Sequence, residues 1–193
     1  MFCPRSIIEC VGYHPRIETA QFASFLTSRT RNSELWFIQN PALEHAILGY
    51  LAKFSKRRGV KLYGFAIEGN HVQGVAHFPN ANRASFMQEL NSCIAQAVPR
   101  HCAEYPGGGL FQRRYSNEFL MGDEDIEDRF FYTVLQQVQD GLVERISDYP
   151  GYNCFHDAVC GIERKFTVIN WAEYHARKRY DPSLSINQFK ETV

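Results

Sequence analysis

Apolar and polar positions change their period several times along the chain, and each period predicts an element. Residues 21–30 (QFASFLTSRT) alternate and are rich in strand formers, which predicts a first strand. Asn40 and Pro41 then predict a helix start, because asparagine caps helices and proline fits the first helical position. Apolar residues recur there at spacings of three and four until Gly59, which predicts the helix end: Leu43, Ala46, Ile47, Tyr50, Leu51 and Phe54.

The rest of the chain up to about residue 143 continues this alternation of strands and helices. A Gly69-Asn70 turn predicts an antiparallel hairpin between two of the strands. The predicted elements are strands at 60–68 and 71–78, a helix at 82–101, a loop at 106–109, a strand at 110–119 and a helix at 123–143.

The resulting order, β-α-β-β-α-β-α, predicts an α+β fold of the ferredoxin-like kind. Its simplest packing is a four-stranded antiparallel sheet with two helices on one face, which leaves the other face to the third helix. We expect an N-terminal arm at 1–20, this domain at 21–152, and a C-terminal tail at 153–193 with a short helix near 171–179.

Composition narrows the function classes. The chain has 193 residues, enough for one domain, and its 21 basic and 21 acidic residues cancel. Binding to an anionic partner through an overall positive charge is therefore not expected, although a local basic face is compatible with zero net charge. No apolar run approaches the roughly 20 residues of a membrane helix, and residues 1–10 lack a signal-peptide core. We expect a cytoplasmic protein that makes no membrane contact.

The six cysteines form no Cys-x-x-Cys pair, so reduced and mostly buried thiols are expected. The alternative is a metal site that joins the pairs Cys3/Cys10 and Cys154/Cys160 with His14 or His156.

Polar side chains alternate along the third predicted strand. His71, Gln73 and His77 share one face with Val75, while the opposite face is apolar or small and should meet the helices: Val72, Gly74, Ala76 and Phe78. Polar groups on a central strand cost desolvation unless they have partners. The pattern therefore indicates either a hydrogen-bonded patch or a functional site.

The third predicted helix carries a second candidate pair. Its apolar stripe comprises Phe130, Phe131, Val134, Leu135, Val138 and Leu142. Tyr132 and Gln136 lie off this stripe and one turn apart, so a phenol and an amide oxygen can point at the same target. The alternative is a surface tyrosine with an ordinary helical neighbour.

Four segments together resemble the REP-associated tyrosine transposases of the HUH endonuclease superfamily. Asn70-His71-Val72-Gln73 resembles their PNHVH strand, and Thr27-Ser28-Arg29-Thr30 resembles the end of their FVTxRT strand. Residues 110–115 (LFQRRY) resemble their WQxRF strand, and residues 131–150 resemble their YIxxNPVxxGLV…DYP stretch. The resemblance covers roughly residues 21–152, with the motifs in the order of the family.

The resemblance implies roles for particular residues. Tyr132 occupies the nucleophile position, and His71, Gln73 and Gln136 occupy the positions of the metal ligands. Gln73 departs from the second histidine of the family, and Gln136-Gln137 replaces its Asn-Pro. Amide oxygens still suit Mg²⁺ or Mn²⁺. His77 is an accessory candidate, although the four residues of strand from Gln73 to His77 span about 13 Å, which disfavours direct ligation by both.

The implied activity is cleavage and rejoining of single-stranded DNA, or of a DNA hairpin, through a 5′-phosphotyrosine intermediate. Cationic candidates for holding DNA are Lys53, Arg57, Arg58, Arg113 and Arg114. Both a monomer and a homodimer fit the sequence, and the resemblance implies a prokaryotic protein associated with the nucleoid. Two alternatives remain: a DNA-binding protein of the same fold with little or no cleavage, which Gln73 favours, and a ferredoxin-like RNA-binding or regulatory domain. The paired aromatic strand motif of RNA-recognition modules is not found here.

Overall fold

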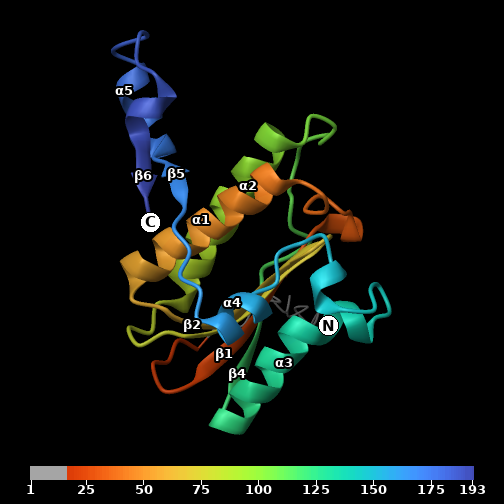
Figure 1. Ribbon diagram of the computed structural model, residues 1–193. Coiled ribbons are helices and arrows are strands. Elements are labelled where there is room, and N and C mark those ends of the chain that lie inside the picture. Colours follow the sequence, from red (N-terminus) through yellow and green to blue (C-terminus); the bar gives the residue numbers. More distant parts are fainter. Residues whose placement is uncertain (1–16) are drawn as a thin grey trace, which may run out of the picture.

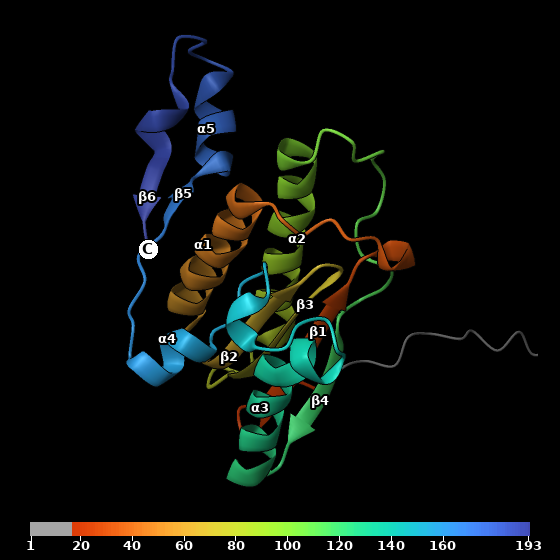
Figure 2. The same ribbon diagram turned by 45° about the vertical axis from the view of Figure 1, so that its right-hand side comes forward.

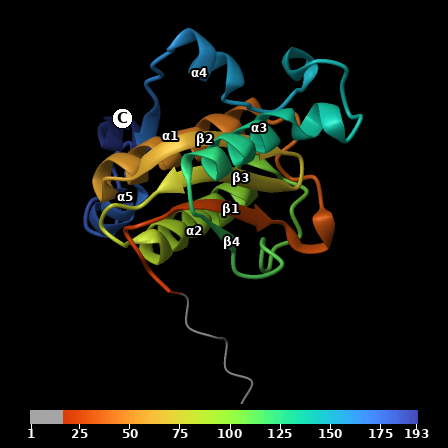
Figure 3. The same ribbon diagram turned by 90° about the horizontal axis from the view of Figure 1, so that it is seen from below.

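The computed structural model describes residues 17–193, and its centre is a four-stranded antiparallel sheet (Figure 1). The strands are β1 (Ala23–Arg29), β2 (Lys61–Glu68), β3 (His71–His77) and β4 (Ser116–Leu120). They lie in the order β2-β3-β1-β4, which Figure 3 shows from below. This is the predicted ferredoxin-like arrangement, so the predicted fold class is confirmed. Most of the predicted arm at 1–20, together with Cys3, Cys10 and His14, lies outside the described residues.

Two helices cover one face of the sheet and a third covers the other (Figures 1 and 2). α1 (Pro41–Arg58) and α2 (Arg83–His101) lie side by side, and α3 (Asp123–Gln139) lies opposite them. The main core fills the space between the sheet and α1/α2, and Val72, Ala76 and Phe78 belong to it, as their alternation predicts. The helix boundaries follow local chemistry: Asn40 Oδ1 accepts a hydrogen bond from the Leu43 amide at 3.0 Å.

Two predicted boundaries are wrong, and tertiary hydrogen bonds explain both. The fourth strand begins at Ser116 instead of 110, because the preceding segment bonds across the end of β1, with Gln112 N donating to Arg29 O at 3.0 Å. The third helix ends at Gln139 instead of 143. Gly141 adopts φ 68°, and Leu142 N donates back to Gln137 O at 2.9 Å, which terminates the helix.

The tail at 153–193 folds onto the domain. It contains α4 (Phe155–Cys160), β5 (Thr167–Ile169), α5 (Trp171–Lys178) and β6 (Lys190–Thr192), together with a short 3-10 helix, Ile186–Phe189. A further 3-10 turn, Ile146–Asp148, precedes it, and another, Arg31–Ser33, follows β1. Strand β5 packs so tightly on α1 that a side-chain carbon at Gly49 would lie 2.4 Å from Val168. α5 confirms the predicted short helix.

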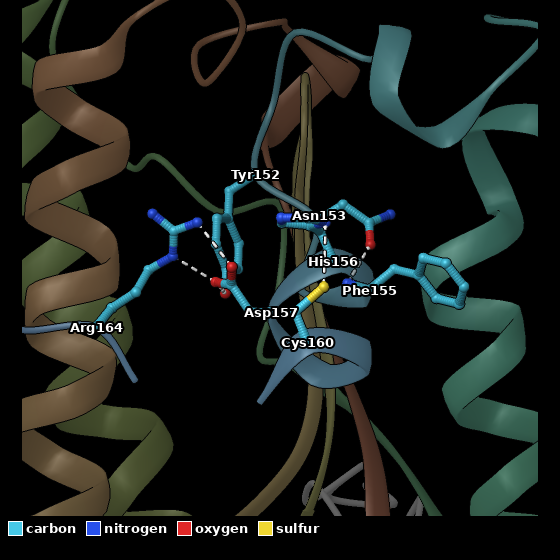
Figure 4. Close-up of polar contacts among 7 residues, drawn as sticks. All are labelled: Tyr152, Asn153, Phe155, His156, Asp157, Cys160 and Arg164. Carbon is cyan, nitrogen blue, oxygen red and sulfur yellow. Dashed lines mark hydrogen bonds and ion pairs between the residues drawn. The ribbon is translucent and has the colours of Figure 1, made fainter. Parts of the chain in front are cut away.

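Polar contacts fix the start of the tail (Figure 4). The Tyr152 hydroxyl donates to Asp157 at 3.0 Å, and Arg164 makes a two-point ion pair with the same carboxylate. Cys154 accepts from the Phe65 amide at 3.2 Å, whereas Cys160 lies 3.8 Å from His156. Within residues 17–193, no three His, Cys, Asp or Glu side chains group in a way that could hold a metal ion. Over the same range, no helix is long and apolar enough to cross a membrane.

Candidate functional site

The polar face of β3 is buried under α3. His71 is 4% exposed and Gln73 is 2% exposed. In the antiparallel register His71 lies beside Arg29 of β1 and Glu68 of β2, whereas Gln73 lies beside Thr27 and Ala66. Directly paired residues of neighbouring strands project to the same face of a sheet, so Arg29 and Glu68 flank the histidine.

α3 approaches the sheet closely because β2 carries a glycine below it. A side-chain carbon at Gly64 would lie 2.8 Å from the Phe130 ring. The buried face of α3 is centred on Thr133, Val134 and Gln137, whereas the predicted stripe included Phe131, which is 41% exposed, and Leu142, which lies beyond the helix. The stripe prediction is wrong at these positions because the helix covers a polar sheet face, where buried amides replace apolar side chains.

The structure brings together the three predicted metal-ligand residues. Gln73 Nε2 donates to Gln136 Oε1 at 2.7 Å, and the His71 imidazole faces both amides. Gln136 in turn donates from Nε2 to Asp140 Oδ2 at 3.3 Å. Side chains from one strand and one helix, more than sixty residues apart in sequence, therefore meet at a single point.

Asn70 sets the orientation of the His71 ring. The asparagine amide donates to Ser33 O at 3.3 Å, which leaves its Oδ1 facing His71 Nδ1 at 2.7 Å. Because Oδ1 can only accept, Nδ1 carries the imidazole proton in this arrangement and Nε2 is the unprotonated nitrogen. Arg29 Nη1 donates to the same Oδ1 at 3.3 Å. Metal-binding histidines are commonly oriented by such an outer hydrogen bond.

The His71 side chain is held in its neutral form. The pKa of His71 is lowered to about 4, first by burial and second by the neighbouring Arg29 charge, while Gln136, Asp140 and Gln73 act in the opposite direction. A neutral imidazole is the form that can bind a metal ion.

A second polar network surrounds Glu68, which the sequence reasoning missed. Gln137 donates from Nε2 to the Glu68 carboxylate and accepts from Asn153 at 3.1 Å. Burial raises the pKa of Glu68, whereas its hydrogen bonds from Tyr149 and Gln137 lower it. Glu68 ends a predicted strand directly before the Gly69-Asn70 turn, and this position is the signal that could have placed it beside His71.

A cavity of about 470 Å³ opens over this cluster. Its polar lining includes Arg29, Glu68, His71, Gln136 and Asp140. Apolar residues contribute the rest of its rim, among them Leu35, Ile38, Leu142 and Val143. The cavity therefore gives a solvent-connected path to the convergent polar groups.

Tyr132 lies outside the lining of this cavity, one helical turn before Gln136. The side chain is 37% exposed, and its ring packs edge-on against Phe25 at a centroid distance of 5.7 Å. The Arg129 guanidinium lies 5.5 Å from the same ring and pairs with Glu118 at 2.7 Å. Four residues of helix place the Tyr132 backbone about 6 Å from that of Gln136 along the helix axis.

Other predicted site residues lie elsewhere. His77 sits at the far end of β3, where its Nε2 contacts Ala20 O at 2.8 Å. Arg113 and Arg114 are exposed and line a second cavity of about 230 Å³, to which Arg29 also contributes. Arg29 thus borders both cavities, which adjoin at this residue.

The predicted cations of α1 lie in the layer on the opposite face of the sheet. Lys53 pairs with Glu191 at 2.6 Å, while Arg57 and Arg58 both pair with Glu89, at 2.5 and 2.7 Å. The structure therefore does not bring them together with His71.

The donor set fits a divalent metal ion. His71 offers an imidazole nitrogen, Gln136 and Gln73 offer amide oxygens, and Asp140 supplies a carboxylate in the same cavity. One feature opposes ready binding: Gln73 now turns its amide nitrogen toward Gln136, so its oxygen can reach a shared ion only after the amide turns over.

Comparison with known proteins agrees with these motifs. No family model matches the chain. A Haemophilus influenzae protein assigned as a REP-associated tyrosine transposase is 25% identical over 96 residues, which cover 45% of this chain. The chain spans about half the length of that relative, at 54%.

A solved structure extends the likeness to the fold. The REP-associated tyrosine transposase bound to a REP hairpin superposes with a TM-score of 0.63 at 18% identity, covering 79% of this chain and 88% of that one. The resemblance read from the motifs is therefore confirmed: the chain is similar to the REP-associated tyrosine transposases in sequence and in fold.

Proposed function

We propose that this protein is an endonuclease and strand transferase for single-stranded DNA, with Tyr132 as the nucleophile. One observation carries the proposal. His71, Gln73 and Gln136 converge on one buried point, and Tyr132 precedes Gln136 by one turn of the same helix. Such a convergence of an imidazole and two amides beside a half-exposed tyrosine matches the needs of attack on a phosphodiester.

The proposed reaction exchanges one phosphoester for another. The Tyr132 oxygen attacks a backbone phosphorus and forms a Tyr–O–P bond, while the bond from phosphorus to the 3′ oxygen breaks. The phenol proton passes to solvent, and the departing 3′ oxygen takes up a proton and leaves as a free 3′-OH. Attack by a 3′-OH on the phosphotyrosine reverses the process, so no nucleotide energy source is required.

A divalent ion, Mg²⁺ or Mn²⁺, completes the proposed site. When bound, it supplies positive charge that polarises a phosphate oxygen. His71 would hold it through Nε2, the atom that the Asn70 contact leaves free, and Gln136 and Gln73 would hold it through their amide oxygens. Asp140 lies in the same lining and adds the negative charge that the three neutral ligands lack.

Cationic residues outline a path for the DNA backbone. Arg29 borders the His71 cavity and also the neighbouring cavity lined by Arg113 and Arg114. Three guanidinium groups along adjoining cavities suit consecutive phosphates. Since the similar solved transposase is bound to a REP hairpin, we propose a DNA hairpin with a single-stranded flank as the substrate.

A second candidate function is DNA binding without cleavage. The hydrogen bond between Gln73 and Gln136 favours it, because a donor occupies the place where a metal-ligand oxygen would be needed. In that case the arginines would still bind DNA and Tyr132 would stay unmodified.

Incubation with single-stranded and hairpin oligonucleotides in Mn²⁺, followed by a denaturing gel, tests the choice. The endonuclease gives a protein band shifted by covalently attached DNA, which requires the metal and is missing with plain duplex. Retardation on a native gel without any covalent band would support the second candidate and contradict the first.

A further inference from the structure

A groove of about 560 Å³ lies on the face of the protein away from His71, between the two-helix layer and the tail. α1 and α2 form its floor, and α5 closes one side, where the tail stands against these helices in Figures 1 and 2. This volume falls within the roughly 300–1,000 Å³ typical of ligand pockets. The His71 site uses none of the residues that line it.

The charged residues that line the groove are predominantly cationic. It contains Lys53, Arg57, Arg58 and Arg100, against the single carboxylate of Glu89. Arg57 and Arg58 share Glu89, and Lys53 pairs with Glu191 of the tail. Arg100 makes no ion pair to a carboxylate within residues 17–193. The groove therefore keeps a positive charge that suits an anionic ligand.

Planar groups stand next to that charge. The Arg100 guanidinium lies 4.2 Å from the centroid of the Trp171 ring, and the His175 ring stacks on Trp171 at 5.7 Å with an interplanar angle of 23°. Arg100 and His175 are exposed, so another planar ring can stack on the group that they form with Trp171. Nucleic-acid bases stack on aromatic and guanidinium planes.

Uncharged hydrogen-bonding side chains complete the lining. They come from the exposed side of α2 and comprise Ser85, Gln88, Ser92 and Gln96. These groups can donate to phosphate oxygens and to base edges alike. An acidic peptide would satisfy the charge of the groove but would leave the stacked planes without a partner.

We infer that this groove binds a single-stranded segment of nucleic acid, with a phosphate at Arg100 and a base against the stack that Arg100, Trp171 and His175 form. The inference goes beyond the proposed function, because it places a second nucleic-acid contact on the other face of the sheet. It does not require that the protein cut DNA.

Trp171 is a built-in reporter for the test. The chain has two tryptophans, and the other, Trp36, packs on Tyr105 with a centroid distance of 5.1 Å, outside the groove lining. The full-length protein is titrated with a ten-nucleotide oligo-dT in EDTA, and tryptophan emission is followed. We expect saturable quenching that Trp171→Phe abolishes and that declines as salt is raised.

Matched variants separate this groove from the proposed active site. Arg100→Glu should weaken the quenching titration on the order of tenfold, whereas Arg179→Glu, an exposed arginine of the tail outside the lining, should leave it within about twofold. Replacing Arg113 and Arg114 by alanine should also preserve the quenching. Circular dichroism melting curves establish that each variant is folded.

Three outcomes would overturn the inference. The first is an absence of quenching in the wild-type protein, and the second is equal weakening by Arg100→Glu and Arg179→Glu. The third is equal quenching by a ten-residue glutamate peptide, which would indicate a peptide site. A missing covalent adduct in the cleavage assay would contradict the proposed function alone and would leave this result unchanged.

Discussion

Replacing Gln73 by histidine should tighten the binding of Mn²⁺. In the wild-type protein, ligation by Gln73 breaks its 2.7 Å hydrogen bond to Gln136 and turns the amide over. A net hydrogen bond contributes about 1 kcal/mol to stability, which corresponds to about fivefold in affinity. The imidazole of Gln73→His binds without that rearrangement and donates more strongly than an amide, so we expect a gain on the order of tenfold or more.

Isothermal titration calorimetry with Mn²⁺, in the presence of a short single-stranded oligonucleotide, measures this gain. Gln188→His is the matched control, because it makes the same change at an exposed residue of the tail, outside the cavity lining. The control should bind Mn²⁺ like the wild-type protein. Equal affinity of the wild-type and Gln73→His proteins would show that residue 73 is not a ligand and would refute the reasoning.

Three smaller predictions follow from individual contacts. Asn70→Ala should weaken Mn²⁺ binding about tenfold in the same calorimetric assay, because the imidazole loses the acceptor that fixes its proton; unchanged affinity would contradict this. Gln137→Leu should lower the free energy of unfolding in urea by about 1–3 kcal/mol, because it removes one of the two side-chain donors to the buried Glu68; a change within 0.5 kcal/mol would argue against it. Hydrogen bonding from Arg164 holds the pKa of Asp157 below its ordinary value of 3.8, so its stabilisation is present above that pH and is lost as pH falls through the lower folded-state value. Melting temperatures measured from pH 6 to 3 should therefore decrease less for Asp157→Asn than for the wild-type protein. An equal decrease in both proteins would contradict a stabilising role of the Asp157 carboxylate.

Most of the fold could be predicted because its signals are local. The Asn40 cap, the Gly59 stop and the Gly69-Asn70 turn each act within a few residues, and the structure confirms all three. The errors arose where contacts with segments distant in the sequence determine the local structure. Residues 110–115 have the composition of a strand but bond across the end of β1, and the rotation of α3 depends on the polar surface that it covers.

The candidate site shows the same division. Alternation places His71 and Gln73 on one face, and helical spacing places Tyr132 and Gln136 one turn apart, so these residues could be proposed from the sequence. The contribution of Glu68 depends on the register of β2 against β3, for which the Gly69-Asn70 turn is the only signal in the sequence, and its hydrogen bond to Gln137 depends on how α3 packs on the sheet. Likewise, the ion pairs of α1 form with Glu89 and Glu191, which are remote along the chain, so charge alone could not show them.

The position of the covalent DNA adduct identifies the nucleophile. Tyr149 is the matched control, because its hydroxyl accepts from the Gly69 amide at 3.0 Å, and burial beside Glu68 raises its pKa well above the usual range, which makes it a poor nucleophile. With a single-stranded or hairpin oligonucleotide and Mn²⁺, the account predicts a phosphotyrosine adduct that mass spectrometry maps to Tyr132, and that Tyr132→Phe eliminates while Tyr149→Phe retains. An adduct that forms at the normal rate in Tyr132→Phe, or that disappears only in Tyr149→Phe, would contradict the account.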